Sequence, residues 1–172
     1  AVRLSEGLLK HSDQVAASHH AVHALLLFQM ARLPARSDRA GKVILLRDQD
    51  RSLWDNGYVS QAFDHLRLAQ AAPELTRYHL EAGIASLHAK AQAWHQTDWA
   101  QISRLYEILA TQSSALGVLV SWATSLLQLN ELDKAETILK RAESARGAQS
   151  FPGYFLAKAM LAERRGNADA AR

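Results

Sequence analysis

Residues that break helices are scarce in this chain, and their scarcity constrains its fold more than any other feature. The 172 residues include only 3 prolines and 8 glycines, whereas a fold of many short strands needs such residues in its frequent turns. Apolar residues recur at spacings of three and four, which is the period of an amphipathic α-helix. The sequence therefore predicts an all-α fold. Because 48% of the residues are hydrophobic, a core of ordinary size is expected.

The helical spacing predicts roughly eight helices along the chain. The first is expected near Val2, and a long second helix follows with Asp13 as its candidate N-cap. That second helix should end at Pro34, because the residue before a proline is disfavoured in helical conformation. Further helices are predicted over residues 54–69, 73–91, 99–109 and 116–127. Their candidate cap or first-turn residues are, in the same order, Asp50 or Ser52, Pro73, Asp98, and Ser113 or Ser114.

The helical period fails between Pro34 and Asp50. The segment contains Gly41 and a run of four apolar residues, Val43–Leu46. This run is compatible with a short strand or with an extended plug in the core. A connection of this length inside a compact domain is usually functional, or else its elements have been misassigned. We expect residues 34–50 to form one long irregular connection that packs across the helical array.

A weak internal repeat occupies the last third of the chain. Residues 130–135 resemble residues 166–171, which lie 36 residues further on. At the same offset Leu119 falls on Phe155, Val120 on Leu156 and Ala123 on Ala159. A period near 34 residues with a Gly or Asn turn, an Asp and an Ala is the tetratricopeptide pattern. Asn130 and Gly166 suit the left-handed conformation that ends a helix. Residues 114–172 are therefore predicted to be tetratricopeptide-like pairs in an array of stacked antiparallel helical hairpins.

No spacing of reactive side chains in the sequence points to catalysis. The chain has no cysteine, which excludes disulfides and thiolate ligands. Two histidines on one helix face, His19 and His23, do not make a zinc site, which needs three or four ligands. Glycine-rich phosphate loops and nucleophile elbows are absent as well. We therefore expect no enzymatic activity, no metal and no cofactor. The alternative, an enzyme, would have a pocket lined by His79, Glu81 and His88.

The charge of the chain is nearly balanced, with a formal net charge of +3. This balance argues against direct nucleic-acid binding. A local basic patch is interrupted by acids and is interpreted as a solvated face. The patch consists of Arg32, Arg36, Arg39 and Arg47. No apolar run approaches the ~20 residues of a membrane span, and no signal peptide is recognisable. We expect a cytoplasmic protein without membrane contact.

The stretch from Arg32 to Asp55 resembles the C-terminal extension of a subgroup of bacterial extracytoplasmic-function sigma factors. The resemblance rests on Arg32–Arg36, Gly41, Val43–Leu46 and Asp48–Asp55. It continues through residues 78–89 and 97–106. In that family the extension carries tetratricopeptide-like repeats and follows two domains that bind RNA polymerase and promoter DNA. The family helix near Leu119–Ala123 usually carries an Asn and an Arg, where this chain has Ser121 and Trp122.

The resemblance implies that residues 1–172 are a single helical-repeat domain from a longer chain whose sigma domains are absent here. It implies a regulatory protein-interaction domain that modulates transcription initiation. Its partners would be the sigma domains of the full-length chain, the RNA polymerase core or a regulator, with promoter DNA contacted only through the absent domains. The candidate interface or structural lock consists of Arg36, Asp48, Gln49, Asp50, Arg51 and Trp54. We favour the structural lock. The alternative function is a free-standing tetratricopeptide-like adaptor unrelated to transcription.

Overall fold

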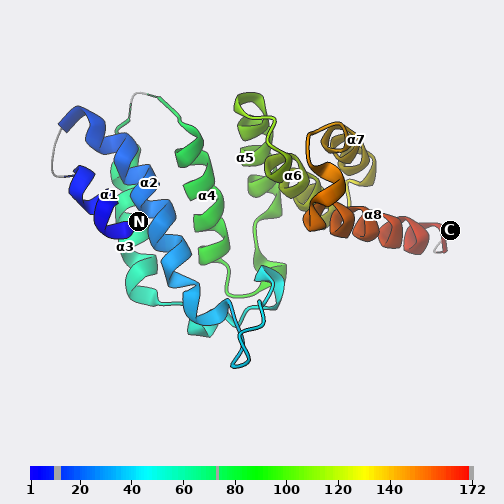
Figure 1. Cartoon of the computed structure of the whole chain (residues 1–172), viewed down its shortest axis with the longest axis horizontal. Coiled ribbons are helices and arrows are strands. Elements are labelled where there is room, and N and C mark those ends of the chain that lie inside the picture. Colours follow the sequence, from blue (N-terminus) through cyan, green and yellow to red (C-terminus); the bar gives the residue numbers. More distant parts are fainter. Residues whose placement is uncertain (10–12, 73, 171–172) are drawn as a thin grey trace. The chain divides into compact units, whose positions relative to one another are not determined.

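The computed structural model describes residues 1–9, 13–72 and 74–170, and this part of the chain has an all-α fold (Figure 1). Eight α-helices lie within the described residues: α1 (Val2–Leu9), α2 (Asp13–Ala31), α3 (Asn56–Ala69), α4 (Arg77–Lys90), α5 (Trp99–Gln112), α6 (Leu116–Gln128), α7 (Leu132–Glu143) and α8 (Pro152–Ala170). The predicted fold class is therefore confirmed. The chain divides into two compact units, Ala1–Thr97 and Asp98–Arg172. The assignment to a single domain stays a prediction.

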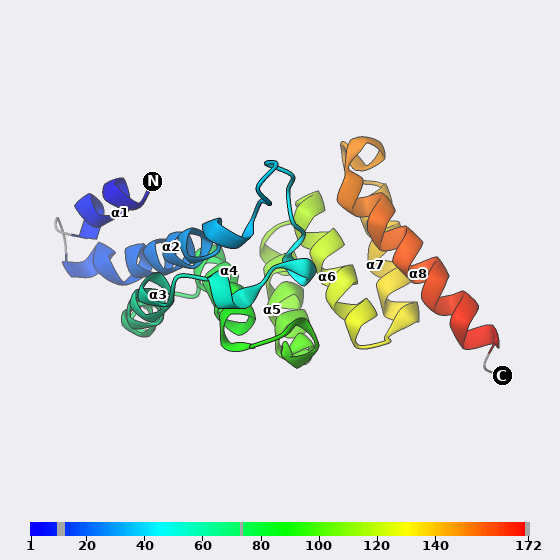
Figure 2. The ribbon, with the colours of Figure 1, turned by 90° about the horizontal axis from the view of Figure 1, so that it is seen from below.

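Helix α2 is the centre of the first unit, where it packs against α1, α3 and α4 (Figures 1 and 2). Its buried residues are Ala21, Ala24, Leu27, Phe28 and Ala31, together with His23. The alanines bring neighbouring helices close to α2, since they carry no bulky side chain at the contact. The Phe28 ring meets the edge of the Phe63 ring on α3, with centroids 5.2 Å apart. A helix enclosed by three others explains why α2 is apolar around most of its circumference.

The start of α3 differs from its prediction. Asp55 is the N-cap, because its Oδ1 atom accepts hydrogen bonds from the backbone N–H of Gly57 (2.8 Å) and Tyr58 (3.0 Å). The assignment of Asp50 or Ser52 as the cap is wrong. Asp50 instead accepts from the backbone N–H of Ser52 and begins a single 3₁₀ turn, Arg51–Leu53. Trp54 follows this turn in extended conformation, so helical geometry begins only after Asp55.

Three other predicted helix starts have different outcomes. Helix α4 begins at Arg77 with a capping box between Thr76 and His79, so Pro73 is not in its first turn; Pro73 itself lies outside the described residues. Asp98 caps α5 as predicted, accepting from the backbone N–H of Gln101 at 2.9 Å. Ala115 occupies the N-cap position of α6 and gives no side-chain cap, so the prediction of a serine cap there is wrong. The side chain of Asp13 lies outside the described residues.

Ser113 lies too far before α6 to cap the helix. Ser113 Oγ accepts from the backbone N–H of Ala115 at 3.3 Å. This bond orders the turn before the helix.

Helices α5 to α8 form the second unit, in which each helix packs on the next and α6 also packs on α8. Its buried core residues come mainly from α6, α7 and α8: Leu119, Val120, Ala123, Leu126, Leu127, Ala135, Ile138, Leu139, Ala142, Tyr154, Ala157 and Leu161. Asn130 adopts a left-handed conformation with φ of 59°, as predicted. The backbone N–H of Glu131 donates to Leu126 O (3.0 Å) and that of Asn130 to Leu127 O (3.1 Å). These two bonds are the Schellman motif that ends α6.

The predicted register of the repeat in α8 is wrong. Leu119, Val120 and Ala123 are buried, but Phe155, Leu156 and Ala159, which lie 36 residues further on, are exposed. An offset of 34 residues matches buried positions instead: Val120 with Tyr154, Ala123 with Ala157, and Leu127 with Leu161. Gly166 lies inside α8 and does not end it. The similarity of polar turn residues misplaces the register because the buried apolar face determines how a helix packs.

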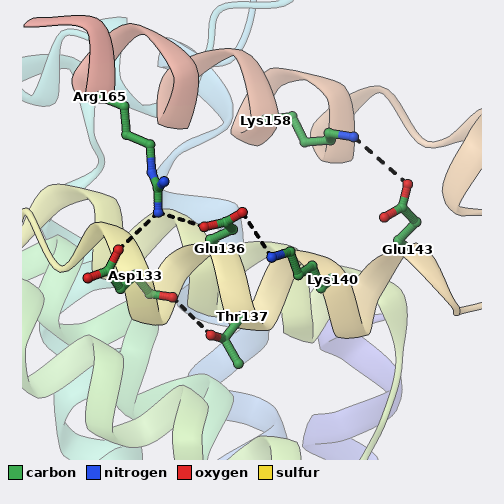
Figure 3. Close-up of polar contacts among 7 residues, drawn as sticks. All are labelled: Asp133, Glu136, Thr137, Lys140, Glu143, Lys158 and Arg165. Atoms are coloured by element: carbon green, nitrogen blue, oxygen red, sulfur yellow. Dashed lines mark hydrogen bonds and ion pairs between the residues drawn. The ribbon is translucent and has the colours of Figure 1, made fainter. Parts of the chain in front are cut away.

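An ion network joins α7 and α8 on the surface of the second unit (Figure 3). The Arg165 guanidinium on α8 donates to Asp133 (2.9 Å) and Glu136 (2.6 Å) on α7. Glu136 also pairs with Lys140 one helical turn further along α7 (3.0 Å). The lysine lowers the pKa of the Glu136 carboxyl, with Arg165 as a further cause. Arg165 and Glu136 are partly exposed and Asp133 is fully exposed, so the network contributes only modestly to stability.

Candidate functional site

The connection between α2 and α3 contains an ordered hairpin, residues 37–43, that projects from the helices (Figures 1 and 2). Ser37 and Val43 form an isolated antiparallel bridge. Asp38 Oδ1 accepts from the backbone N–H groups of Ala40 and Lys42, both at 2.9 Å. Gly41 at the tip has φ of 80°, a left-handed conformation that glycine adopts without a steric penalty. We call this element the 37–43 hairpin.

Several apolar residues of this connection face solvent, while Ile44 and Leu46 are half-buried. Val43 is 72% exposed and Leu45 48% exposed, while Leu33 and Leu53 are also about half exposed. The run Val43–Leu46 is therefore neither a strand of a sheet nor a buried plug. The reason is that Ile44 N donates to Arg36 O (2.9 Å), and this bond holds the run against its own hairpin instead of the helices.

Positive charge is concentrated in the same segment. Residues 32–51 contain six Arg or Lys and three Asp, a net charge of +3, which equals the formal net charge of the whole chain. Two of the three aspartates serve local turns, Asp38 in the hairpin and Asp50 before the 3₁₀ turn. Asp48 pairs with Arg47 at 3.4 Å in an exposed position. The exposed cations that remain are Arg36, Arg39 and Lys42.

Trp54 is buried between two arginines. Its indole is 6% exposed and lies 5.5 Å from the Arg32 guanidinium carbon and 5.3 Å from that of Arg51. Gln49, which is also buried, accepts from Arg32 Nε (3.3 Å) and donates to Ile44 O (3.1 Å). Arg32, Gln49, Arg51 and Trp54 together form what we call the tryptophan lock. It ties both ends of the connection to one point.

Arg51 extends the tryptophan lock to the end of α4. Its Nη1 atom donates to the carbonyl of His88 and, at 2.7 Å, to that of Ala91. Its Nη2 atom approaches Thr97 Oγ1 at 3.4 Å. A cation is stabilised at a helix C-terminus because the last carbonyl groups there lack intrahelical partners. The lock therefore connects the long connection to α4 as well as to α2.

His88 lies beside the tryptophan lock on α4, and its ring stacks on Trp94 with centroids 6.1 Å apart. Burial lowers the pKa of His88 from 6.5 to about 4, with the positive charges of Arg51 and Arg32 as further causes. The imidazole is therefore neutral at physiological pH.

The six residues singled out in the sequence occupy two places. Gln49, Arg51 and Trp54 belong to the tryptophan lock, while Arg36 and Asp48 are exposed on the hairpin side. Asp50 is exposed and caps the 3₁₀ turn; its hydrogen bonds from Ser52 lower the pKa of its carboxyl. Four of the six residues therefore have a structural role, while Arg36 and Asp48 lie exposed on the surface.

A groove that the sequence did not reveal adjoins the connection. It has a volume of about 620 Å³ and lies among α1, α2, α3 and the 3₁₀ turn Leu33–Ala35. Its lining residues are Ala1, Val2, Arg3, Glu6, Leu26, Leu27, Gln29, Met30, Leu33, Arg36, Tyr58 and Gln61. We call it the α1–α3 groove. Arg36 and Leu33 belong to both the groove and the connection, so the two form one continuous surface.

The histidines of α2 form a cluster with α1 and α3. His23 Nδ1 is 2.7 Å from Ser5 Oγ, and His20 Nδ1 is 2.7 Å from His65 Nδ1. Burial lowers the pKa of His20, His23 and His65. Among the described residues, no group of three or more His, Asp or Glu side chains is arranged to hold a metal ion. These histidines join helices through contacts between their rings and with Ser5.

The three residues of the enzymatic alternative have separate partners. His79 Nδ1 accepts from the Thr76 backbone N–H at 3.1 Å and belongs to the α4 cap. Glu81 pairs with Arg77 at 2.9 Å, and His88 stacks on Trp94. These side chains line neither the α1–α3 groove nor the smaller cavity between α7 and α8.

Comparison with known proteins finds similarity over part of the chain. Residues 1–70 match a protein family of unknown function, DUF6596. An uncharacterized protein of Rhizobium meliloti (strain 1021) is 43% identical over 86 residues, which are 50% of this chain and 20% of that relative. The matched part thus spans about a fifth of the relative's length. No solved structure matches the chain. In the described part of the chain, no helix combines the length and the apolar character that crossing a bilayer requires.

Proposed function

We propose that this chain is a regulatory protein-interaction domain of an alternative sigma factor, modulating transcription initiation through contacts with the sigma domains or RNA polymerase. The observation that carries the proposal is the 37–43 hairpin with its flanking residues. This segment is held in one conformation by hydrogen bonds, yet Val43 and Leu45 lie in solvent. Apolar residues displayed on an ordered surface typically mark an interaction site.

Two further observations support this proposal. The stretch that resembles the extension of extracytoplasmic-function sigma factors, residues 32–55, contains both the hairpin and the tryptophan lock. The family matched by residues 1–70 is found at the C-terminus of sigma-70 family proteins. In this proposal the domain works in the cytoplasm, follows the polymerase-binding and promoter-binding domains, and reaches DNA only through them.

The proposal requires the chain to recognise the transcription machinery directly. The test uses purified residues 1–172, core RNA polymerase, and the two sigma domains of the same gene expressed as a separate polypeptide. Binding is measured by size-exclusion chromatography and calorimetry, and transcription by run-off from a cognate promoter. We expect a complex with the sigma domains or the core enzyme, and a change in transcript yield on adding the chain.

A free-standing adaptor gives a different result. The chain would then bind neither the sigma domains nor the core enzyme and would leave transcript yield unchanged. The coding sequence upstream of Ala1 gives an independent check. The proposal expects a polymerase-binding domain followed by a helix-turn-helix there; a start codon within a few residues would refute it.

A further inference from the structure

The α1–α3 groove and the hairpin combine apolar and positively charged residues on one surface. The floor of the groove is apolar and contains Leu26, Leu27 and Met30, with Tyr58 from α3. Its charged rim carries two arginines, Arg3 and Arg36, and one carboxylate, Glu6. An apolar floor with a positive rim suits a ligand that is apolar on one side and negatively charged at its edges.

The cations around the groove are available to a partner. Within residues 1–9, 13–72 and 74–170, no carboxylate forms an ion pair with Arg3, Arg36, Arg39 or Lys42. The Asp residues of the connection are engaged in their own turns or with Arg47. The net charge of +3 carried by residues 32–51 is therefore not neutralised by neighbours.

The apolar surface extends beyond the groove. Leu33 lines the groove and is about half exposed. The backbone bond from Ile44 to Arg36 brings Val43 and Leu45 alongside the residue on the groove rim. A small molecule inside the groove would leave these hairpin residues uncovered. A polypeptide segment can fill the groove and cover the hairpin as well, in the manner of an amphipathic segment binding a helical groove.

We propose that the α1–α3 groove and the 37–43 hairpin bind an acidic amphipathic segment of a protein partner. Its bulky apolar side chains would occupy the groove over Leu26, Met30 and Tyr58. Its carboxylates would meet Arg3 and Arg36 on the rim and the cations of the hairpin. This inference rests on the proposed function, because it names the chemistry of the partner that the domain recognises.

Two synthetic peptides test the partner chemistry. Both carry leucine at helical spacing along one face; one has glutamate and the other lysine at the polar positions. Fluorescence anisotropy measures the binding of each labelled peptide to residues 1–172 at low and high salt. We expect the glutamate peptide to bind, with an affinity that falls as salt rises, and the lysine peptide not to bind. Equal binding of both peptides, or binding of neither, would overturn the inference.

Four substitutions test the location. Leu33→Glu and Arg36→Glu change exposed groove residues, and each should weaken the binding of the glutamate peptide by about tenfold or more. Leu68→Glu and Arg67→Glu are matched controls on exposed positions of α3 outside the groove and should leave its affinity unchanged. Circular dichroism and thermal unfolding check that all four variants fold. Equal effects at the groove and control positions would overturn the inference.

The same variants separate this inference from the proposed function. If the chain binds the sigma domains or core polymerase and both groove variants bind them equally well, the groove is not the docking site, although the proposed function stands. If the unmodified chain binds neither protein but binds the glutamate peptide through the groove, the partner chemistry is right and the partner lies outside transcription.

Discussion

The buried histidine beside the tryptophan lock should make the stability of the first unit depend on pH. The pKa of His88 is lowered from 6.5 to about 4, first by burial and then by Arg51 and Arg32. A pKa that is lower in the folded state means that the unfolded chain binds the proton more tightly between these two values. The stabilisation is therefore complete above pH 6.5 and is lost as pH falls toward 4.

The magnitude follows from the gap between the two pKa values. At about 1.4 kcal/mol for each pH unit, a gap of about 2.5 units gives roughly 3 kcal/mol. The perturbation is His88→Gln, which keeps a polar side chain but does not titrate. Urea denaturation of both proteins at a series of pH values gives the free energy of unfolding of the first unit. The difference between wild type and variant should shrink by roughly 3 kcal/mol as pH falls from 6.5 to 4.

The other histidines of the first unit do not affect the stability difference between wild type and His88→Gln. Burial also lowers the pKa of His20, His23 and His65, but these residues are present in both proteins and cancel in the difference. Nuclear magnetic resonance of the His88 ring gives its pKa directly, and Arg51→Gln should raise that pKa by removing a neighbouring positive charge. A stability difference that stays constant from pH 6.5 to 4 would refute the reasoning.

Three further substitutions probe single features of the fold, each measured by urea denaturation. Trp54→Ala should lower the free energy of unfolding by roughly 3–5 kcal/mol, because it empties the space between Arg32 and Arg51. Trp54→Phe should lower it less, since among the described residues no acceptor bonds to Trp54 Nε1. Equal losses of stability in the two variants would argue against packing as the cause. Asp55→Ala should cost about 1 kcal/mol through the lost cap of α3, whereas an unchanged stability would show that Asp55 is dispensable. Ala135→Leu should cost roughly 1–3 kcal/mol, because Ala135 is fully buried between α7 and its neighbours; a more stable variant would reveal unfilled space there.

The sequence predicts the helices better than it predicts how their faces meet. Asp98 and Asn130 were correctly interpreted because each acts through its own backbone or that of the next few residues. The repeat register of α8 was wrong, since the exposed positions of Phe155 and Leu156 depend on which face packs against α6 and α7. Similar turn residues do not carry that information.

The start of α3 shows a second kind of limit. Asp50, Ser52 and Asp55 are all suitable cap residues within a short stretch. Local preference alone cannot choose among them. The choice falls on Asp55 because the burial of Trp54 keeps the backbone extended just before it. Burial of this kind is a tertiary property.

The candidate site could be predicted only in part. The run from Asp48 to Trp54 stands out in the sequence, and the structure places Gln49, Arg51 and Trp54 together. The α1–α3 groove could not be predicted, because it combines Arg3 and Glu6 of α1 with residues of α2 and α3 that are distant in sequence. Only the packing of the three helices creates it.

The side chain of Arg51 binds the backbone at the end of α4, through the carbonyl groups of His88 and Ala91. Every amino acid supplies such a carbonyl, so the hydrogen-bond acceptors of Arg51 cannot be recognised in the sequence. Substitutions along the end of α4 should preserve this contact as long as the helix ends at the same place, whereas a replacement of Arg51 that lacks a forked cation cannot donate to both carbonyl groups as arginine does. Among diverging relatives we therefore expect the donor Arg51 to be retained while the side chains at the end of α4 vary.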